Sequence, residues 1–316
     1  MTGDTAGAPA IGYLGPAGTF TEEALRALHG EDVAAWPAPT VPAALDGVRE
    51  GRLDAAVVPL ENSVEGSVPA TLDELVHGEP LQIRREAHVR VGFALLAREE
   101  LPLDRVRTVA THPHAAAQTR RWLQEHLPQA QVVAEASTAR AAELVAEGRH
   151  DAAVAAPRAA AHYGLVSLAD GIADRPGAVT RFVEVARPGP PPPPTGADTT
   201  SLVVFIRRNR PGALLEVLEQ FAVRGIDLSR LESRPTGEAL GRYCFTVDAV
   251  GHVAEPRMGE ALAGLWRTSA GVRFLGSYPR ADRTVAQVPE EAGAAAYEAA
   301  QAWVESLRRD GGRSAP

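Results

Sequence analysis

Polar side chains follow short apolar runs at several places in the sequence, where a ligand could reach them. The first two such turns are Gly15-Pro-Ala-Gly-Thr-Phe-Thr21 and Pro59-Leu-Glu-Asn-Ser63. Between them they offer the hydroxyl of Thr19, the carboxylate of Glu61, the amide of Asn62 and the hydroxyl of Ser63. These groups could hydrogen-bond an anionic ligand at a strand end, although Asn and Ser are also ordinary turn formers.

Two more segments of this kind lie further along the chain. Thr111-His-Pro-His-Ala-Ala-Ala-Gln118 carries two histidines, but the sequence has a single cysteine and no third ligand at a recognisable spacing, so we expect no metal site. Thr180-Arg-Phe182 places a hydroxyl beside a guanidinium. That pair could serve an anionic substrate, with Thr180 as a donor to a leaving hydroxyl and Arg181 as a clamp.

An internal repeat indicates which elements position these groups. Gly51-Arg-Leu-Asp-Ala-Ala-Val-Val-Pro59 is echoed by Gly148-Arg-His-Asp-Ala-Ala-Val-Ala-Ala-Pro157, and each follows an amphipathic helical stretch. Strands that alternate with helices predict two doubly wound α/β lobes, at about 10–80 plus 170–186 and at 100–168. Ligands bind outside the carboxyl ends of such strands, so the polar turns should line a cleft between the lobes within a domain at 10–186.

A proline-rich segment at 187–198 predicts a stiff linker to a second domain. The pattern at 199–282 reads strand, helix, strand, strand, helix, strand, which is the ferredoxin-like βαββαβ motif. The tail at 283–316 predicts a helix with Ala296, Ala300, Trp303 and Leu307 on one face, which we expect to dock on another surface.

Length and charge narrow the function. A chain of 316 residues favours two or three compact units, and a net charge of −8 argues against nucleic acid as a partner. The N-terminus has no basic start or apolar run, and no stretch reaches the roughly 20 apolar residues that a membrane span needs. We therefore expect a cytoplasmic protein that acts on small molecules.

In order and spacing, the motifs resemble those of the prephenate dehydratase family across nearly the whole chain. The matching segments are Gly15-Pro-Ala-Gly-Thr-Phe20, Pro59-Leu-Glu-Asn-Ser63 with Gly66, His112-Pro with Gln118, Ser137-Thr138-Ala139, Tyr163-Gly-Leu165 and Thr180-Arg-Phe182. The region after the linker is similar to the family's ACT regulatory domain. One position departs from the pattern, because Ala178 stands where the family usually has asparagine.

The resemblance implies a periplasmic-binding-protein-like catalytic domain followed by an ACT domain, and the conversion of prephenate to phenylpyruvate, water and carbon dioxide without metal or organic cofactor. It implies that Thr180 donates to the departing oxygen, with protons supplied through Glu61 or water. The residues it assigns to catalysis or substrate binding are Thr180, Glu61, Asn62, Ser63, Gln118, Thr19, Thr111, Arg181 and Phe182.

The resemblance also implies regulation by phenylalanine. The matching segments are Gly212, Ala213, Leu214 and Leu215, and Glu232, Ser233, Arg234 and Pro235. Phenylalanine would bind between the ACT domains of two subunits in a homodimer or homotetramer. An arogenate dehydratase and a non-catalytic two-lobed metabolite sensor remain as alternatives.

Overall fold

The computed structural model describes residues 9–237 and 242–310. Two compact units make up the chain, one of Met1–Glu74 with Glu86–Arg187 and the other of Leu75–Arg85 with Pro188–Pro316. Gly241, where a strand was expected to start, and 311–316, the end of the expected tail, lie outside the described residues. None of the helices that the structure describes is long and apolar enough to cross a bilayer.

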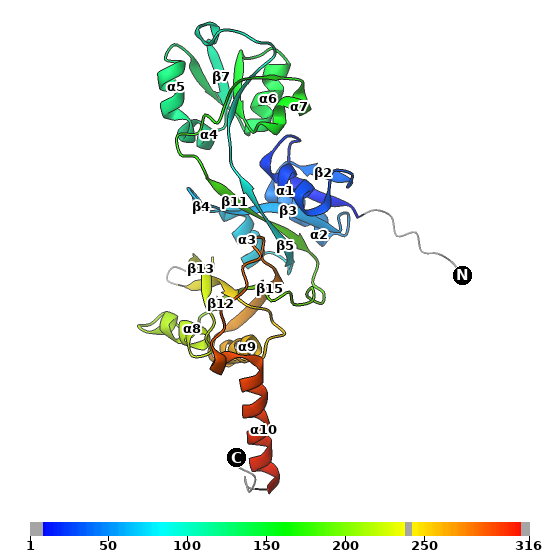
Figure 1. The fold of residues 1–316 in the computed structure, drawn as a ribbon, viewed down its shortest axis with the longest axis vertical. Coiled ribbons are helices and arrows are strands. Elements are labelled where there is room, and N and C mark those ends of the chain that lie inside the picture. The colour runs from blue at the N-terminus through cyan, green and yellow to red at the C-terminus, as the bar shows by residue number, and fades with distance from the viewer. Residues whose placement is uncertain (1–8, 238–241, 311–316) are drawn as a thin grey trace, which may run out of the picture. The chain divides into compact units, whose positions relative to one another are not determined.

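The first lobe is built on a mixed sheet with strand order β2-β1-β3-β11-β5, and the short β4 pairs with β3 (Figure 1). Its strands are β1 Ile11–Leu14, β2 Ala35–Ala38, β3 Ala55–Asn62, β4 Gly66–Ser67, β5 Gln82–Arg90 and β11 Val179–Ala186. Its helices are α1 Phe20–His29, α2 Val41–Arg49 and α3 Pro69–His77. Strands β1, β2 and β3 run parallel, while β11 returns antiparallel to β3.

The second lobe has a five-stranded sheet of order β10-β6-β9-β7-β8. Its strands are β6 Ala94–Ala97, β7 Thr108–Thr111, β8 Gln131–Ala134, β9 Ala152–Ala155 and β10 Val166–Asp170. Its helices are α4 Pro113–Gln118, α5 Arg120–His126, α6 Thr138–Ala146 and α7 Arg158–Tyr163, with the 3₁₀ turn η1 Leu103–Arg105. The strands β7, β8 and β9 are parallel, and β6 and β10 add antiparallel pairs, so the predicted α/β class is confirmed with sheets of mixed orientation.

The internal repeat corresponds to the same local structure in both lobes. In the first, α2 leads to β3 and the carboxylate of Asp54 accepts the backbone N–H of Ala10, which precedes β1, at 2.9 Å. In the second, α6 leads to β9 and Asp151 accepts the backbone N–H of Arg107, just before β7, also at 2.9 Å. Each aspartate therefore ties the start of one parallel strand to the start of its neighbour, which accounts for the aspartate in the repeated Gly-Arg-x-Asp-Ala-Ala pattern.

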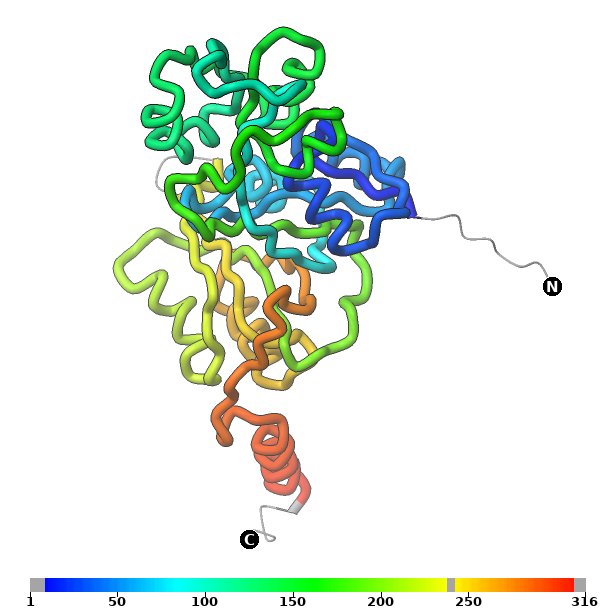
Figure 2. The backbone as a smooth tube through the Cα atoms, turned by 45° about the horizontal axis from the view of Figure 1, so that its top comes forward, coloured from blue at the N-terminus to red at the C-terminus, as the bar shows by residue number. Residues whose placement is uncertain are grey.

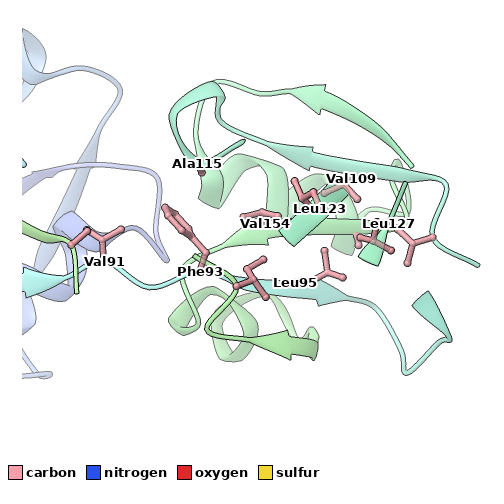
Figure 3. Close-up of a cluster of buried hydrophobic side chains, with 12 residues drawn as sticks. Val91, Phe93, Leu95, Val109, Ala115, Leu123, Leu127 and Val154 are labelled. Carbon is pink, nitrogen blue, oxygen red and sulfur yellow. The ribbon is translucent and has the colours of Figure 1, made fainter. Parts of the chain in front are cut away.

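The chain crosses between the lobes twice, at 91–93 and at 171–178, as the cyan and green tubes show (Figure 2). The crossings are hydrogen-bonded to each other, from Val91 N to the oxygen of Ala178 at 2.7 Å and from Ile172 N to the oxygen of Phe93 at 3.1 Å. Both crossings enter the apolar core of the second lobe, where Val91 and Phe93 lie at one side of the cluster (Figure 3). Because each large buried side chain contributes about 1.5–3 kcal/mol, this core holds the crossings firmly.

The second unit confirms the predicted βαββαβ motif. Its elements are β12 Asp198–Phe205, α8 Ala213–Ala222, β13 Leu228–Pro235, β14 Tyr243–Val250, α9 Pro256–Thr268 and β15 Gly271–Pro279. The strands form an antiparallel sheet of order β13-β14-β12-β15. Alternate apolar residues of β12 and β14 pack against both helices, because one face of each strand carries the core.

The second unit also includes Leu75–Arg85, a segment within the domain predicted at 10–186, of which 75–80 was predicted to belong to the first lobe. Arg273 Nη1 donates to the oxygens of Leu75 and Gly78 at 3.1 and 2.7 Å. Gly276, with φ of 135°, lies so close to Ile83 that a Cβ there would come 2.2 Å from the oxygen of Ile83. No sequence signal marks these contacts, since they join residues almost 200 positions apart.

The tail forms the 3₁₀ turn η2 Glu290–Ala292 and the helix α10 Ala294–Asp310, drawn in red (Figure 1). On its apolar face, Trp303 is 52% exposed and Leu307 is 40% exposed. A single chain therefore leaves this face open, and its docking on another surface stays a prediction.

Candidate functional site

A cavity of about 310 Å³ lies in the first unit and is lined by residues of both lobes. This volume is at the lower end of the range of about 300–1,000 Å³ that is usual for small-molecule sites. Five of the residues expected at the site line it: Thr19, Asn62, Gln118, Thr180 and Phe182. They come from the ends of β3 and β11, from the turn after β1 and from α4, as strand-end chemistry predicts.

The centre of the site is a hydrogen bond between neighbouring strands. Asn62 and Thr180 lie opposite each other on β3 and β11, and the Asn62 Nδ2 donates to Thr180 Oγ1 at 2.8 Å. The Asn62 Oδ1 accepts the backbone N–H groups of Val64 and Glu65 at 2.8 and 3.1 Å, which fixes the amide so that its nitrogen faces Thr180. Because the Thr180 oxygen accepts this bond, its own proton is available to donate to a bound ligand.

Ser63 is placed beside the cavity and not in its wall. Its backbone N–H donates to the oxygen of Val179 at 2.9 Å, and its Oγ accepts the N–H of Val179 at 3.0 Å. Ser63 therefore joins the end of β3 to the start of β11 and positions Thr180 through the backbone, and its predicted contact with substrate stays a prediction.

Glu61 and Arg181 also lie outside the cavity lining, and their predicted roles in proton supply and substrate binding stay predictions. Side chains alternate along a strand, so Arg181 points away from the face that carries Thr180 and Phe182. Its Nε donates to Glu86 Oε2 at 2.7 Å, and the two side chains are only 13% and 5% exposed. Glu61 lies opposite Arg181 in the pairing of β3 with β11. It directly precedes Asn62, so its side chain emerges on the other face of the strand from that of Asn62. Arg181 is thus held in a buried ion pair behind the site.

Thr111 also lies outside the cavity lining. It is fully buried, and its hydroxyl donates to the oxygen of Val154 at 2.8 Å. It therefore braces β7 against β9, and the next residue, His112, is the one that lines the cavity. Burial, with a smaller effect of His114, lowers the pKa of His112 below its usual 6.5, which favours a neutral ring.

Three helices begin at this cavity, and the residues that cap them are part of its lining. Thr19 Oγ1 accepts the N–H of Glu22 at 3.3 Å at the start of α1, and Ser137 Oγ accepts the N–H of Arg140 at 3.0 Å at the start of α6. His112 caps α4 in the same way. Helix N-termini attract anions. The three helices therefore give the cavity a positive electrostatic potential although no arginine is among its described lining residues.

The turn that carries Thr19 is held by both lobes. Glu22 Oε2 accepts the N–H of Gly18 at 2.7 Å, and Tyr163 on α7 donates its hydroxyl to the oxygen of Ala17 at 2.9 Å. Gly18 has φ of 80°, and a Cβ there would come 3.3 Å from the Tyr163 ring, so the close approach of α7 requires glycine. This contact joins two of the segments that resemble motifs of the family.

Glu65 is a lining residue that the sequence did not reveal. Its Oε1 accepts Gln118 Nε2 at 2.6 Å, and its other oxygen contacts His114 Nδ1, so the turn after β3 is tied to α4 across the cavity. A turn residue before Gly66 carries no local sign of a partner more than 40 positions away. Phe20, the last residue of the first motif, and Phe93, which the sequence did not reveal, form an apolar wall, edge to face with centroids 5.9 Å apart.

Ala178, the departure from the family pattern, is buried in the apolar core of the second lobe. Its backbone oxygen accepts the N–H of Val91, which stabilises the crossing, and its methyl group offers no polar contact. Across the described parts of the chain, no group of three or more His, Cys, Asp or Glu side chains is arranged to hold a metal ion.

The expected effector residues lie on two elements of the second unit. Gly212, with φ of 84°, caps α8, and Ala213 lines a cavity of about 300 Å³ together with side chains from the β12–α8 loop and the end of α9. The segment from Glu232 to Pro235 lies on β13, an edge strand of the sheet. A role in phenylalanine binding stays a prediction for all eight residues.

Comparisons with known proteins agree with these features. The family model for prephenate dehydratase matches residues 11–190. A prephenate dehydratase of Mycobacterium marinum is 48% identical over 315 residues, which is 97% of this chain and 98% of that protein. The crystal structure of the Arthrobacter aurescens prephenate dehydratase in complex with L-Phe is similar with a TM-score of 0.90, 48% identity and coverage of 95% of this chain and 99% of that one. A protein described as a quorum-quenching acylase, GqqA, is similar with a TM-score of 0.77, 33% identity and coverage of 85% and 97%.

Proposed function

The chain belongs to the prephenate dehydratase family, and from this premise we propose that it converts prephenate to phenylpyruvate under the control of phenylalanine. The observation that carries the chemical part is the hydrogen bond from Asn62 to Thr180 inside the cavity. It leaves the proton of the Thr180 hydroxyl available to donate to a ligand in the cavity.

The reaction needs little more than a better leaving group and a held geometry. The ring carboxylate leaves as carbon dioxide, its bonding electrons move into the ring, and the ring hydroxyl takes up a proton and leaves as water. Aromatisation of the ring provides the driving force. We propose that Thr180 donates a hydrogen bond to the departing oxygen, while Asn62 and Gln118 fix the orientation of the donor and of the substrate.

The proton must come through groups that reach the cavity, because a threonine hydroxyl is itself a weak acid. Glu61, the carboxylate favoured from sequence, does not line the cavity. Among the described lining residues the titratable groups are Glu65, His112 and His114. We propose that the proton reaches the substrate through these three side chains or through water, and that Glu65 takes the role of the carboxylate.

The test is direct. Purified protein incubated with prephenate at neutral pH should form phenylpyruvate, followed by its ultraviolet absorbance, and Thr180→Ala should abolish turnover without a change in melting temperature. Turnover of arogenate, measured in parallel, checks the preference for the keto substrate. A wild-type protein that consumes no prephenate, or a Thr180→Ala variant that remains fully active, would contradict the proposal.

For regulation, we propose that phenylalanine binds between second units of two subunits, at Gly212–Leu215 of one and Glu232–Pro235 of the other. The proposal is supported by the L-Phe complex of the Arthrobacter aurescens protein at 48% identity and by the open edge of β13. A homodimer or homotetramer and a place in the cytoplasm are parts of this proposal. Saturating phenylalanine should change the rate of turnover, and sedimentation should give more than one chain per particle. Equilibrium dialysis without phenylalanine binding would refute it.

A further inference from the structure

A second cavity of about 310 Å³ adjoins the catalytic one in the first unit. Glu65 and Gln118 line both, so the two cavities meet at the contact between these side chains. The second cavity is also lined by three arginines, Arg120, Arg121 and Arg175, which we call the arginine cluster.

The two cavities differ in their content of arginine. No arginine occurs among the described residues that line the catalytic cavity, although the substrate of the proposed function carries two carboxylates. The arginine cluster brings three guanidinium groups to the adjoining cavity, and guanidinium is the side-chain group best suited to bind a carboxylate in bidentate fashion.

The acidic side chains of the second cavity are already engaged. Asp174 accepts the backbone N–H groups of Arg121 and Trp122 at 2.9 and 3.2 Å, and Glu65 accepts Gln118 and contacts His114. In the parts of the chain that the structure describes, none of the three guanidinium groups has an acidic partner. Their charges are therefore available to an anion from solution.

We propose that the arginine cluster is a carboxylate-binding site that captures the dianionic substrate at the entrance of the catalytic cavity. The proposal rests on prephenate as the substrate. A cluster of one sign at the mouth of a cleft raises the local concentration of an oppositely charged ligand and speeds association by about 10- to 1,000-fold. The cluster is separate from the reacting atoms, so it should act on the second-order rate and not on the chemical step.

The kinetic experiment replaces the whole cluster by glutamine, as Arg120→Gln, Arg121→Gln and Arg175→Gln together. At low salt, kcat/KM for prephenate should fall at least about tenfold while kcat stays unchanged. The difference from wild type should vanish as salt rises from about 10 mM to about 1 M, since the Debye length falls from about 30 Å to about 3 Å. Each single substitution should give a partial effect, which keeps the test usable if the triple variant folds poorly.

The matched control removes three other exposed arginines of the second lobe, with Arg105→Gln, Arg107→Gln and Arg149→Gln. They lie at the amino ends of β7 and β9, away from the strand ends that line the catalytic cavity. Their removal changes the net charge by the same amount and should leave kcat/KM within about twofold of wild type. An equal loss in both triple variants, or a loss in the cluster variant that persists at high salt, would overturn the proposal.

A binding measurement separates this site from the proposed reaction. In the Thr180→Ala background, calorimetry with prephenate should give a dissociation constant about tenfold higher when the cluster is also removed. An unchanged dissociation constant would refute the site. If the wild type consumed no prephenate but the cluster still governed binding of this dianion, the site would stand and the proposed reaction would fall.

Discussion

Replacement of Asn62 by aspartate separates the two roles of this side chain. In the wild type its Oδ1 accepts two backbone N–H groups, and its Nδ2 donates to Thr180 at 2.8 Å. Aspartate keeps an oxygen for the turn but has no N–H to donate. The Thr180 hydroxyl would then donate to the new carboxylate, and its proton would no longer be available to the departing oxygen of the substrate.

The expected loss follows from the geometry. Removal of one preorganised donor from an active site typically lowers kcat by about 10²–10³, or about 2.7–4 kcal/mol. Asn62 acts through Thr180 and not on the substrate directly, so we expect the lower end, about 10²-fold. Asn62→Ala should lose activity similarly but should also lower the free energy of unfolding by about 1–3 kcal/mol, because the turn amides lose their acceptor.

Steady-state kinetics with prephenate and thermal melts of the three proteins provide the test. Gln131→Glu, the same amide-to-acid change at the exposed start of β8, is the control and should match the wild type in both assays. Near-normal kcat in a folded Asn62→Asp variant would refute the role of the amide as a donor. Equal melting temperatures for the alanine and aspartate variants would refute its role in the turn.

Three further predictions concern Thr180, the ion pair behind it and a tyrosine of the second lobe. Thr180→Ser should retain measurable turnover because it keeps the hydroxyl, whereas Thr180→Ala should not. Equal activity of the two variants in the phenylpyruvate assay would contradict the donation of a hydrogen bond by the Thr180 hydroxyl. Glu86→Ala should lower the free energy of unfolding, measured in urea, by about 3–5 kcal/mol, because it removes the Glu86 carboxylate from the buried Arg181 guanidinium. Glu86→Gln should lower it by less. A loss below about 1 kcal/mol for the alanine variant would show that the pair is not buried in solution. Burial and, secondarily, Glu143 raise the pKa of Tyr163 to about 12, so between pH 10 and 12 the unfolded chain loses this proton first and stability should fall. Thermal melts of Tyr163→Phe should show a smaller decline over that window, and an identical decline would contradict the shift.

The features that sequence could predict are local ones. The repeated Gly-Arg-x-Asp-Ala-Ala segments placed β3 and β9 correctly, because a strand that follows an amphipathic helix is readable from a few neighbouring residues. The caps at Thr19 and Ser137 need only the residues of one helical turn. The βαββαβ order followed from the same local patterns.

The features that sequence could not predict depend on distant pairing. Thr111 directs its hydroxyl to Val154 and not to the cavity, and nothing in either segment announces this bond. Glu65 reaches Gln118 only because the two lobes face each other there. The side on which Arg181 emerges depends on strand alternation together with a register shift between Arg181 and Phe182, which a motif of three letters does not encode.

The alternation of the Thr180-Arg181-Phe182 triplet has a chemical consequence. Arg181 is neutralised by Glu86 on the far side of the strand. The described lining of the cavity presents the substrate with hydroxyls, amides, helix N-termini, two histidines and the Glu65 carboxylate, but no arginine. Decarboxylation turns a carboxylate into neutral carbon dioxide, and an arginine bound to that carboxylate would stabilise the ground state more than the transition state. A cavity lined without arginine, with cations kept in the arginine cluster outside, can attract the dianion without holding back the group that must leave. The position of Arg181 behind the site is therefore consistent with the chemistry that the family performs, and an arginine bound to the departing carboxylate would oppose it.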